Sequence, residues 1–453
     1  MSSRILLPSG RFVCRGCTGQ LRAKLPRYYS TSTEPDVYDV VCVGGGPAGL
    51  SLLTALRANP VTSGLRVALI EAQDLGKLSD WSLPSDKFSN RCSSLTPASA
   101  NYLNDIGAWS HMKRDRIQEY QEMQVWDGVT DARIEFDVPP TSKNGGVVAY
   151  MIENLNLTSG LLRRIKEIGG VSIFDNAKVE AIALGEETDG MDLRQWPVVQ
   201  LSTGQKLHAR LLVGADGANS PVRTFADIPS RGWAYGRHGV VATLQIEDDG
   251  YSGRGMKTAY QRFLPTGPMA MLPLPEILQP SSEYMHKQPS GQTDELDWRL
   301  QHTSFSPHGV PQVVTGVQEG TIASFPLQLR HADRYIGERV ALVGDAAHTI
   351  HPLAGQGLNQ GQGDIQCLVR TIEYAVSHGQ DIGTLMSLES YNAERYAANH
   401  VLLGVCDKLH KIYSFGSGPL VPLRSWGLNA VNAMKPLKDF LMSQASGSGA
   451  KLF

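Results

Sequence analysis

The chain of 453 residues lacks any apolar run that approaches the roughly 20 residues needed to cross a bilayer as a helix. It also lacks an excess of positive charge. The 42 Lys and Arg residues stand against 44 Asp and Glu residues, and this balance excludes a broadly basic nucleic-acid binder. Internal repeats are absent, and the one low-complexity stretch is a short Ser- and Gly-rich tail after Gln444. These absences indicate a soluble or peripheral globular protein of about three domains.

Cysteine is scarce, with six residues in the chain. Two of them, Cys14 and Cys17, form a single CxxC without the second pair that a zinc site requires. The others are widely spaced in apolar or mixed surroundings, which is typical of reduced structural thiols. These four are Cys42, Cys92, Cys367 and Cys406. The sequence therefore predicts neither a disulfide framework nor a metal site.

Acidic residues are missing from residues 1–33, the first acid being Glu34. The same segment contains six basic residues and several Ser and Thr residues. This composition predicts a mitochondrial transit peptide that is removed from the mature protein. A disordered basic tail is the alternative interpretation.

The first chemical signal is a glycine-rich turn. It lies between a predicted buried strand over 37–43 and a predicted helix over 50–58, and it fits the GxGxxG fingerprint. Gly44 permits the sharp turn, Gly46 lets the backbone approach a pyrophosphate, and Gly49 lets helix and strand pack closely. The N-terminus of the helix supplies N–H donors for an anion.

A second predicted strand, over 65–70, ends at Glu71, about 20 residues after the last glycine of the fingerprint. A dinucleotide-binding fold uses an acid at this distance to accept hydrogen bonds from ribose hydroxyls. Together the two strands, the turn and the acid predict binding of an adenosine diphosphate group. At this point they do not distinguish FAD from NAD.

Two later motifs favour a flavin. A predicted strand over 207–213 leads into an Asp-Gly motif at Asp216, and another over 339–343 leads into a Gly-Asp motif at Asp345, before a predicted helix over 360–376. An aspartate at the end of a strand can bind ribityl or ribose hydroxyls. The N-terminal amides of the following helix can stabilise negative charge on a reduced ring.

These three motifs, at Gly44, Asp216 and Asp345 in this order, resemble those of the group A FAD-dependent aromatic hydroxylases. Within that group, segments 90–99 and 345–359 are most similar to the ubiquinone-biosynthesis monooxygenases. The resemblance implies an α/β fold with a discontinuous Rossmann-like FAD-binding domain, an inserted and predominantly β substrate domain, and a helical C-terminal region.

The resemblance also implies domain boundaries. After the transit peptide they are FAD-binding segments 34–117, 152–235 and 327–396, substrate-domain segments 118–151 and 236–326, and a C-terminal helical region over 397–453. The chain departs from the family pattern after Pro275, where residues 276–319 are polar and show little periodicity. We expect part of the substrate sheet to be missing there.

Site residues follow from the resemblance in the same way. Those expected to hold or approach the adenosine half of FAD are Gly44, Gly46, Gly49, Glu71 and Arg91. Asp216 is expected to support the flavin domain and to shape the groove beside the cofactor. Those expected at the ribityl and pyrophosphate region and at the flavin ring are Asp345, Gly357, Leu358 and Asn359. The catalytic expectation is limited to flavin positioning by Pro352, Gly357 and Leu358. No general acid or base is assigned, and His348 and His351 are expected to be structural.

The implied activity is hydroxylation of the aromatic ring of a polyprenylated hydroxybenzoate intermediate of ubiquinone biosynthesis, through a flavin C4a-hydroperoxide formed with O2. Implied partners are ferredoxin and its reductase as electron source, and other proteins of a biosynthetic complex. The implied location is the matrix side of the mitochondrial inner membrane. Basic amphipathic segments over 397–413 and 420–440 could rest on that membrane or dock against the protein's own domain.

Large residues between the cofactor motifs, such as Val125, Trp126 and Phe263, could line the substrate pocket or simply fill the core. Two alternative functions stay open. One is an NAD(P)H-dependent hydroxylase of a small soluble phenol, although no second nicotinamide fingerprint is present. The other is a non-catalytic flavin-binding subunit of the ubiquinone-biosynthesis complex.

Overall fold

The computed structural model describes residues 35–130, 132–137, 146–187, 191–246, 257–275, 313–352 and 355–434. It also describes two short strands, β1 (Ile5–Leu6) and β2 (Phe12–Val13), which pair antiparallel within the unit Met1–Asp36. The rest of the chain forms a second unit, Val37–Phe453. The CxxC, most of the predicted transit peptide and residues 276–312 lie outside the described residues. Strands were expected to be missing from 276–319, but the described end of that segment forms strand β18 (Val314–Val317), which pairs with β15 (Leu244–Ile246).

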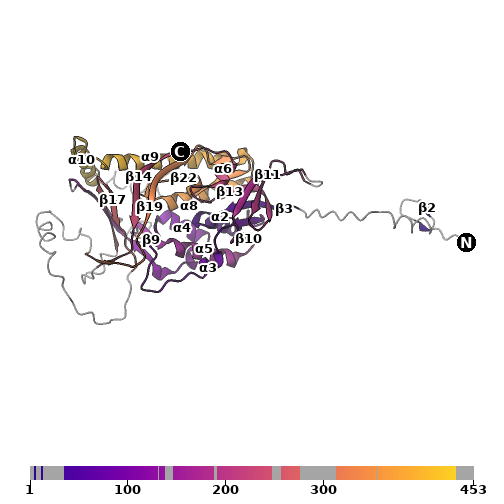
Figure 1. Ribbon diagram of the computed structural model, residues 1–453, viewed down its shortest axis with the longest axis horizontal. Coiled ribbons are helices and arrows are strands. Elements are labelled where there is room, and N and C mark those ends of the chain that lie inside the picture. The colour runs from indigo at the N-terminus through magenta and orange to yellow at the C-terminus, as the bar shows by residue number, and fades with distance from the viewer. Residues whose placement is uncertain are drawn as a thin grey trace. The chain divides into compact units, whose positions relative to one another are not determined.

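An eight-stranded sheet contains the predicted nucleotide-binding strands (Figure 1). Its order is β10-β4-β3-β13-β12-β11, and β21 pairs with β13 and β20. β3 is parallel to β4 and β13 is parallel to β21, as expected of a Rossmann-like sheet. The bounds are β3 (Asp36–Val43), β4 (Val67–Ile70), β10 (Val171–Phe174), β11 (Val179–Leu184), β12 (Pro197–Leu201), β13 (Lys206–Gly214), β20 (Ile336–Gly337) and β21 (Val340–Leu342).

The central strands are apolar because both faces of the sheet are covered. Residues 40–43 of β3 and all four residues of β4 are buried. The helices of this unit include α2 and α5, which pack together, and α8, which packs on α2 and α9. Their bounds are α2 (Pro47–Ala58), α3 (Leu75–Ser79), α4 (Pro97–Asp105), α5 (Asn154–Ile168), α6 (Pro221–Phe225) and α8 (Gly357–Ser377). Short 3₁₀ turns are η1 (Trp109–His111), η2 (Arg114–Arg116) and η4 (Gly344–Ala346).

Smaller sheets combine strands that are distant in the sequence. Their orders are β17-β16-β7-β8, β5-β9-β6, β14-β19-β22 and β15-β18. The bounds are β5 (Cys92–Leu95), β6 (Ile117–Tyr120), β7 (Glu122–Asp127), β8 (Arg133–Asp137), β9 (Ala149–Glu153), β14 (Ser230–Val241), β15 (Leu244–Ile246), β16 (Thr258–Leu264), β17 (Gly267–Met271), β18 (Val314–Val317), β19 (Ala323–Ala332) and β22 (His348–Thr349). The inserted, predominantly β part of the predicted fold is therefore present.

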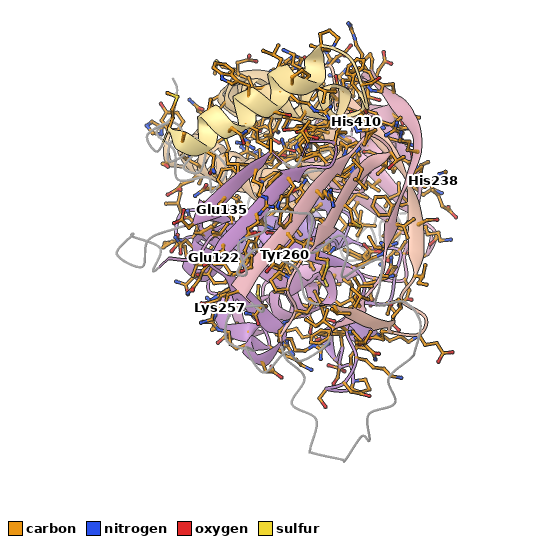
Figure 2. All side chains as sticks on the ribbon, turned by 90° about the vertical axis from the view of Figure 1, so that its left-hand side faces the viewer. Glu122, Glu135, His238, Lys257, Tyr260 and His410 are labelled. Atoms are coloured by element: carbon orange, nitrogen blue, oxygen red, sulfur yellow. The ribbon has the colours of Figure 1, made fainter. Side chains whose placement is uncertain are left out.

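Figure 2 looks onto the four-stranded sheet, where Glu122, Glu135 and Tyr260 lie on neighbouring strands. Val125 and Phe263 are buried in one cluster, and Trp126 is buried and stacks on the ring of Tyr260 at 5.7 Å. These large residues therefore contribute to packing.

Two helices follow at the C-terminus, α9 (Leu385–Tyr413) and α10 (Leu420–Ala433), and they confirm the predicted helical region (Figure 1). α9 is one continuous helix across the boundary predicted at 396 and 397. α10 packs against β8. Among the helices of the described ranges, none combines the length and the apolar character that crossing a bilayer requires.

Candidate functional site

The glycine-rich turn has the geometry of a phosphate cradle. Gly44 has φ of +109°, and a Cβ there would overlap the backbone of Ala215. A Cβ on Gly49 would overlap the carbonyl oxygen of Gly44, so α2 can approach β3 only with glycine at this position. A Cβ on Gly46 would meet nothing within 4 Å, and no side chain caps the N-terminus of α2 there. The first N–H groups of α2 are thus available to an anion.

Glu71 follows β4 and lies against this turn. Its Oε2 accepts a hydrogen bond from the Gly45 N–H at 2.6 Å, and its Oε1 accepts one from the Gln73 N–H at 2.8 Å. Each carboxylate oxygen has two lone pairs, so each can accept one more hydrogen bond. The geometry suits recognition of ribose hydroxyls beside a phosphate bound at the turn.

The Asp-Gly motif lies next to the glycine-rich turn. Asp216 Oδ2 accepts a hydrogen bond from the Val222 N–H at 3.2 Å, at the start of α6. Its Oδ1 is buried without a hydrogen-bond partner, and burial raises the pKa of this carboxyl group. A buried polar atom without a partner is costly, and a hydroxyl or water that reached it would remove that cost.

The Gly-Asp motif follows β21. Gly344 has φ of +58°, and the chain turns there into η4. Asp345 is an exposed residue, and desolvation by the surrounding protein raises the pKa of its carboxyl group. The carboxylate can accept hydrogen bonds from the hydroxyls of a bound ligand.

The loop that ends at α8 carries the other expected flavin-positioning residues. α8 begins at Gly357, three residues earlier than predicted, and Gln356 provides no side-chain cap. Gly357, Leu358 and Asn359 therefore form a first turn whose N–H groups have no partner within the helix. Pro352, at the other end of the loop, is exposed.

Asn359 has a side-chain role that its motif did not reveal. Its Oδ1 accepts hydrogen bonds from the Thr96 N–H at 3.0 Å and from Ser99 Oγ at 2.8 Å. Its Nδ2 donates to the Ser94 carbonyl at 2.8 Å. The Asn359 side chain thus joins α8 to the end of β5. Arg91, the residue before β5, is exposed.

The fold brings the three motifs together at the carboxyl ends of adjacent strands. The Ala215 N–H donates to the Val43 carbonyl at 2.8 Å, and the Val343 N–H donates to the Gly214 carbonyl at 3.0 Å. β3, β13 and β21 thus present the fingerprint, the Asp-Gly motif and the Gly-Asp motif side by side. Ligands of open α/β sheets bind at this end of the strands. The open cradle, the partnerless oxygen of Asp216 and the exposed Asp345 fit FAD.

Two histidines beside the Gly-Asp motif are buried. His348 Nε2 lies 2.6 Å from Asp364 Oδ2, and the ring of His351 packs edge-on against Tyr235 and faces His410 on α9. Sequence reasoning missed Asp364. The available signal was the first acid of a predicted helix, because a carboxylate requires partners when its helix face is buried.

Comparison with known proteins agrees with this site. Residues 37–403 match the FAD binding domain family. The chain is 40% identical to "Ubiquinone biosynthesis monooxygenase COQ6, mitochondrial" of Saccharomyces cerevisiae, with 92% of this chain and 95% of the relative covered. The protein of the same name from Homo sapiens is 34% identical, with 93% and 95% covered.

Solved structures share the fold. The p-nitrophenol 4-monooxygenase PnpA of Pseudomonas putida DLL-E4 superposes with a TM-score of 0.64 at 19% identity, over 92% of this chain and 100% of that one. PqsL of Pseudomonas aeruginosa, a probable FAD-dependent monooxygenase, superposes with a TM-score of 0.61 at 20% identity, over 87% and 99%. The chain belongs to the family of COQ6 ubiquinone biosynthesis monooxygenases and is an FAD-dependent monooxygenase.

Proposed function

We propose that this protein hydroxylates the aromatic ring of a polyprenylated hydroxybenzoate intermediate on the route to ubiquinone. The observation that carries the proposal is that the three motifs meet at the carboxyl ends of β3, β13 and β21. The curated relatives of this chain are named as ubiquinone biosynthesis monooxygenases. Bound FAD supplies the redox chemistry that activates O2. The residues of the chain bind the cofactor, orient it and limit the access of water.

Each predicted site residue has a place in this proposal. Gly44, Gly46 and Gly49 shape the pyrophosphate cradle, and Glu71 accepts hydrogen bonds from the adenosine ribose. The residues proposed for the rest of the cofactor are Arg91, Asp216, Asp345, Pro352, Gly357, Leu358 and Asn359. The first-turn N–H groups of α8 would stabilise negative charge on the flavin ring, and Pro352 would line the site where O2 reacts.

Peripheral contact with the matrix side of the inner membrane is also part of the proposal. α9 exposes Val401, Val405, Leu409 and Ile412, which are three or four residues apart and therefore share one face. On α10, Trp426 is 72% exposed. On α9, the exposed Lys408 and Lys411 lie among these apolar residues, as in segments that rest on anionic lipid. A polyprenylated substrate dissolved in that membrane could then reach the enzyme.

The electron source that we propose is a ferredoxin with its reductase, within a complex of other ubiquinone-biosynthesis proteins. The sequence contains one GxGxxG fingerprint in a strand-turn-helix context, and we assign it to FAD. Reduction by a separate protein would require no nicotinamide site on this chain.

Expression in mitochondria that lack their own ubiquinone hydroxylase tests the proposal, with quinones and prenylated aromatic intermediates measured by mass spectrometry. We expect the wild-type chain to restore ubiquinone. The Gly46→Asp variant should not, because its carboxylate occupies the open cradle and repels a pyrophosphate. Gly64→Asp is a matched control, since a Cβ on Gly64 also meets nothing within 4 Å.

Two other results would redirect the assignment. Persistence of the unhydroxylated intermediate despite stable, FAD-loaded protein would identify a non-catalytic flavin-binding subunit. Stoichiometric oxidation of NAD(P)H with a small phenol would identify a hydroxylase of soluble substrates.

A further inference from the structure

Asp364 is a fully buried carboxylate, two turns into α8, that the proposed function does not use. Its Oδ2 accepts hydrogen bonds from the Gly344 N–H at 3.1 Å and from His348 Nε2 at 2.6 Å. Its Oδ1 accepts from Arg395 Nε at 2.8 Å and from Asn399 Nδ2 at 2.9 Å. A carboxylate has about four acceptor sites. Donors from η4, β22 and α9 therefore occupy all of them.

The charge of Asp364 is retained inside the protein. Burial acts to raise its pKa, but the charges of His348 and Arg395 and the hydrogen bonds that they donate outweigh burial and lower the pKa to about 2. Arg395 also donates to Asn399 Oδ1 at 2.9 Å and to the Gln360 carbonyl at 3.3 Å. The carboxylate is thus held in one orientation by α9 while it holds the Gly-Asp turn.

The turn that Asp364 holds carries the residue proposed for the ribityl chain. The Gly344 N–H is donated to Asp364, and Asp345 is the next residue in the chain. A Cβ on Gly361 would lie 3.7 Å from the Gly344 Cα, so α8 lies directly against the turn. Two residues before the turn, the Leu342 carbonyl accepts a hydrogen bond from the Tyr391 hydroxyl at 2.6 Å, which fixes the end of β21 to α9.

We propose that Asp364 is a positioning residue for FAD, which sets the direction of the Gly344–Asp345 turn and so places the Asp345 carboxylate against the ribityl chain. The inference rests on the proposed placement of FAD at Asp345. It extends that placement to a side chain that does not contact the cofactor. Through Arg395 and Asn399, it also makes α9 part of the support of the cofactor site.

The test compares reconstituted holoenzymes of the wild type and of Asp364→Asn, measuring the FAD dissociation constant, the flavin reduction potential and the visible flavin spectrum. The Asn side chain keeps one acceptor oxygen and places an NH2 group where the other carboxylate oxygen stood. Either the Gly344 and His348 donors or the Arg395 and Asn399 donors therefore lose their acceptor, and the turn relaxes. We expect FAD to bind on the order of 10- to 100-fold more weakly, as when residues that orient metal ligands are changed. We also expect the potential and the spectrum at saturating FAD to shift.

Asp381→Asn is the matched control. Asp381 accepts hydrogen bonds from Arg210 Nε at 2.8 Å, from Arg339 Nη2 at 2.8 Å and from the Gly383 N–H at 3.1 Å, at the opposite end of β21. This variant should melt at a lower temperature and keep the wild-type FAD affinity, potential and spectrum. A merely structural role of Asp364 would give the same pattern for Asp364→Asn.

Two further variants keep the test decisive. Asn399→Ala removes one donor and leaves the charge of Asp364 in place, so it replaces Asp364→Asn if that variant does not fold, with a weaker effect of the same kind. Asp345→Asn tests the placement of FAD itself. Weaker FAD binding in Asp345→Asn, with wild-type affinity and potential in the folded Asp364 or Asn399 variant, overturns the inference alone. Wild-type affinity in Asp345→Asn overturns the placement and the inference together.

Discussion

Replacing Arg424 by methionine should release α10 from the sheet. The Arg424 guanidinium donates to both oxygens of Asp127, at 2.7 and 3.0 Å, and to the carbonyl oxygens of Ile412 and Phe415. The side chains of Arg424 and Asp127 are 4% and 0% exposed. This pair connects α10 to the end of β7, and it also ties down the end of α9.

The free-energy cost of losing this ion pair decides whether only α10 or the whole protein unfolds. Removing one partner of a buried ion pair costs about 3–5 kcal/mol, because the other charge stays buried without compensation. Against this, α10 packs Leu428 and Val431 on the buried cluster around Val125. Two such partly buried side chains contribute about 3–5 kcal/mol at most. The two amounts are similar, so the variant should undock α10 while the FAD-binding sheet stays folded.

Hydrogen exchange followed by mass spectrometry measures this directly. Amides of α10 should exchange on the order of 100- to 1000-fold faster in Arg424→Met, at about 1.4 kcal/mol per tenfold, while those of β3 and β13 are unchanged. The double variant Asp127→Leu/Arg424→Met should restore protection, since an apolar pair in place of a buried ion pair is nearly neutral. Wild-type protection in the single variant, or no recovery in the double variant, would refute the reasoning.

The same ion pair gives a pH dependence. Burial acts to raise the pKa of Asp127, but hydrogen bonds from Arg424, the Val129 N–H and Ser425 outweigh it, and the pKa lies below the ordinary 3.8. A carboxyl group whose pKa is lower in the folded than in the unfolded state stabilises the folded form at any pH above its unfolded-state pKa. That stabilisation is lost as the pH falls through the folded-state pKa. In the wild type, α10 should therefore become more exchangeable only in acid, below about pH 4.

Three shorter predictions follow from local geometry. Gly49→Ala forces a methyl group into the Gly44 carbonyl, so the purified protein should contain little FAD by absorbance; a full FAD complement would contradict the packing argument. Glu153→Gln leaves the buried Arg116 without its 2.7 Å ion pair, and the free energy of unfolding in urea should fall by about 3 kcal/mol. Burial raises the pKa of the Cys42 thiol, so iodoacetamide should label it only after unfolding, and labelling of the native protein would show that it is accessible.

The cofactor motifs could be predicted because each is written in a short stretch of chain. The strand over 37–43 and the glycine-rich turn correspond closely to β3 and the turn before α2, because apolar β-branched residues and glycines act locally. The helix predicted over 50–58 ends where α2 ends, but α2 begins three residues earlier, at Pro47. The start of α8 was placed three residues late. Glycine at 357 disfavours a helix interior but costs less in a first turn, where its N–H needs no helical partner.

Long-range partnerships could not be predicted. Arg424 and Asp127 are 297 residues apart, and nothing in either local sequence selects the other. The parallel pairing of β16 with β7 also joins two segments whose own patterns indicate only strands. Asp364 illustrates the same limit at the cofactor site. The sequence shows an acid in a helix, but its four donors come from segments up to 35 residues away that only the fold brings together.

The length and continuity of α9 fix the distance between Asp364 and the exposed apolar stripe on the same helix. Its 29 residues form an unbroken rod of about 44 Å. The first half of α9 donates hydrogen bonds to Asp364 from Arg395 and Asn399. The second half carries the exposed apolar stripe, which is formed by Val401, Val405, Leu409 and Ile412. A surface that bound this stripe would therefore be held at a fixed distance and angle from Asp364 and the Gly344–Asp345 turn. A few helical residues inserted between Asn399 and Val401 would rotate and shift the exposed stripe, while the contacts of Arg395 and Asn399 with Asp364 would stay as they are.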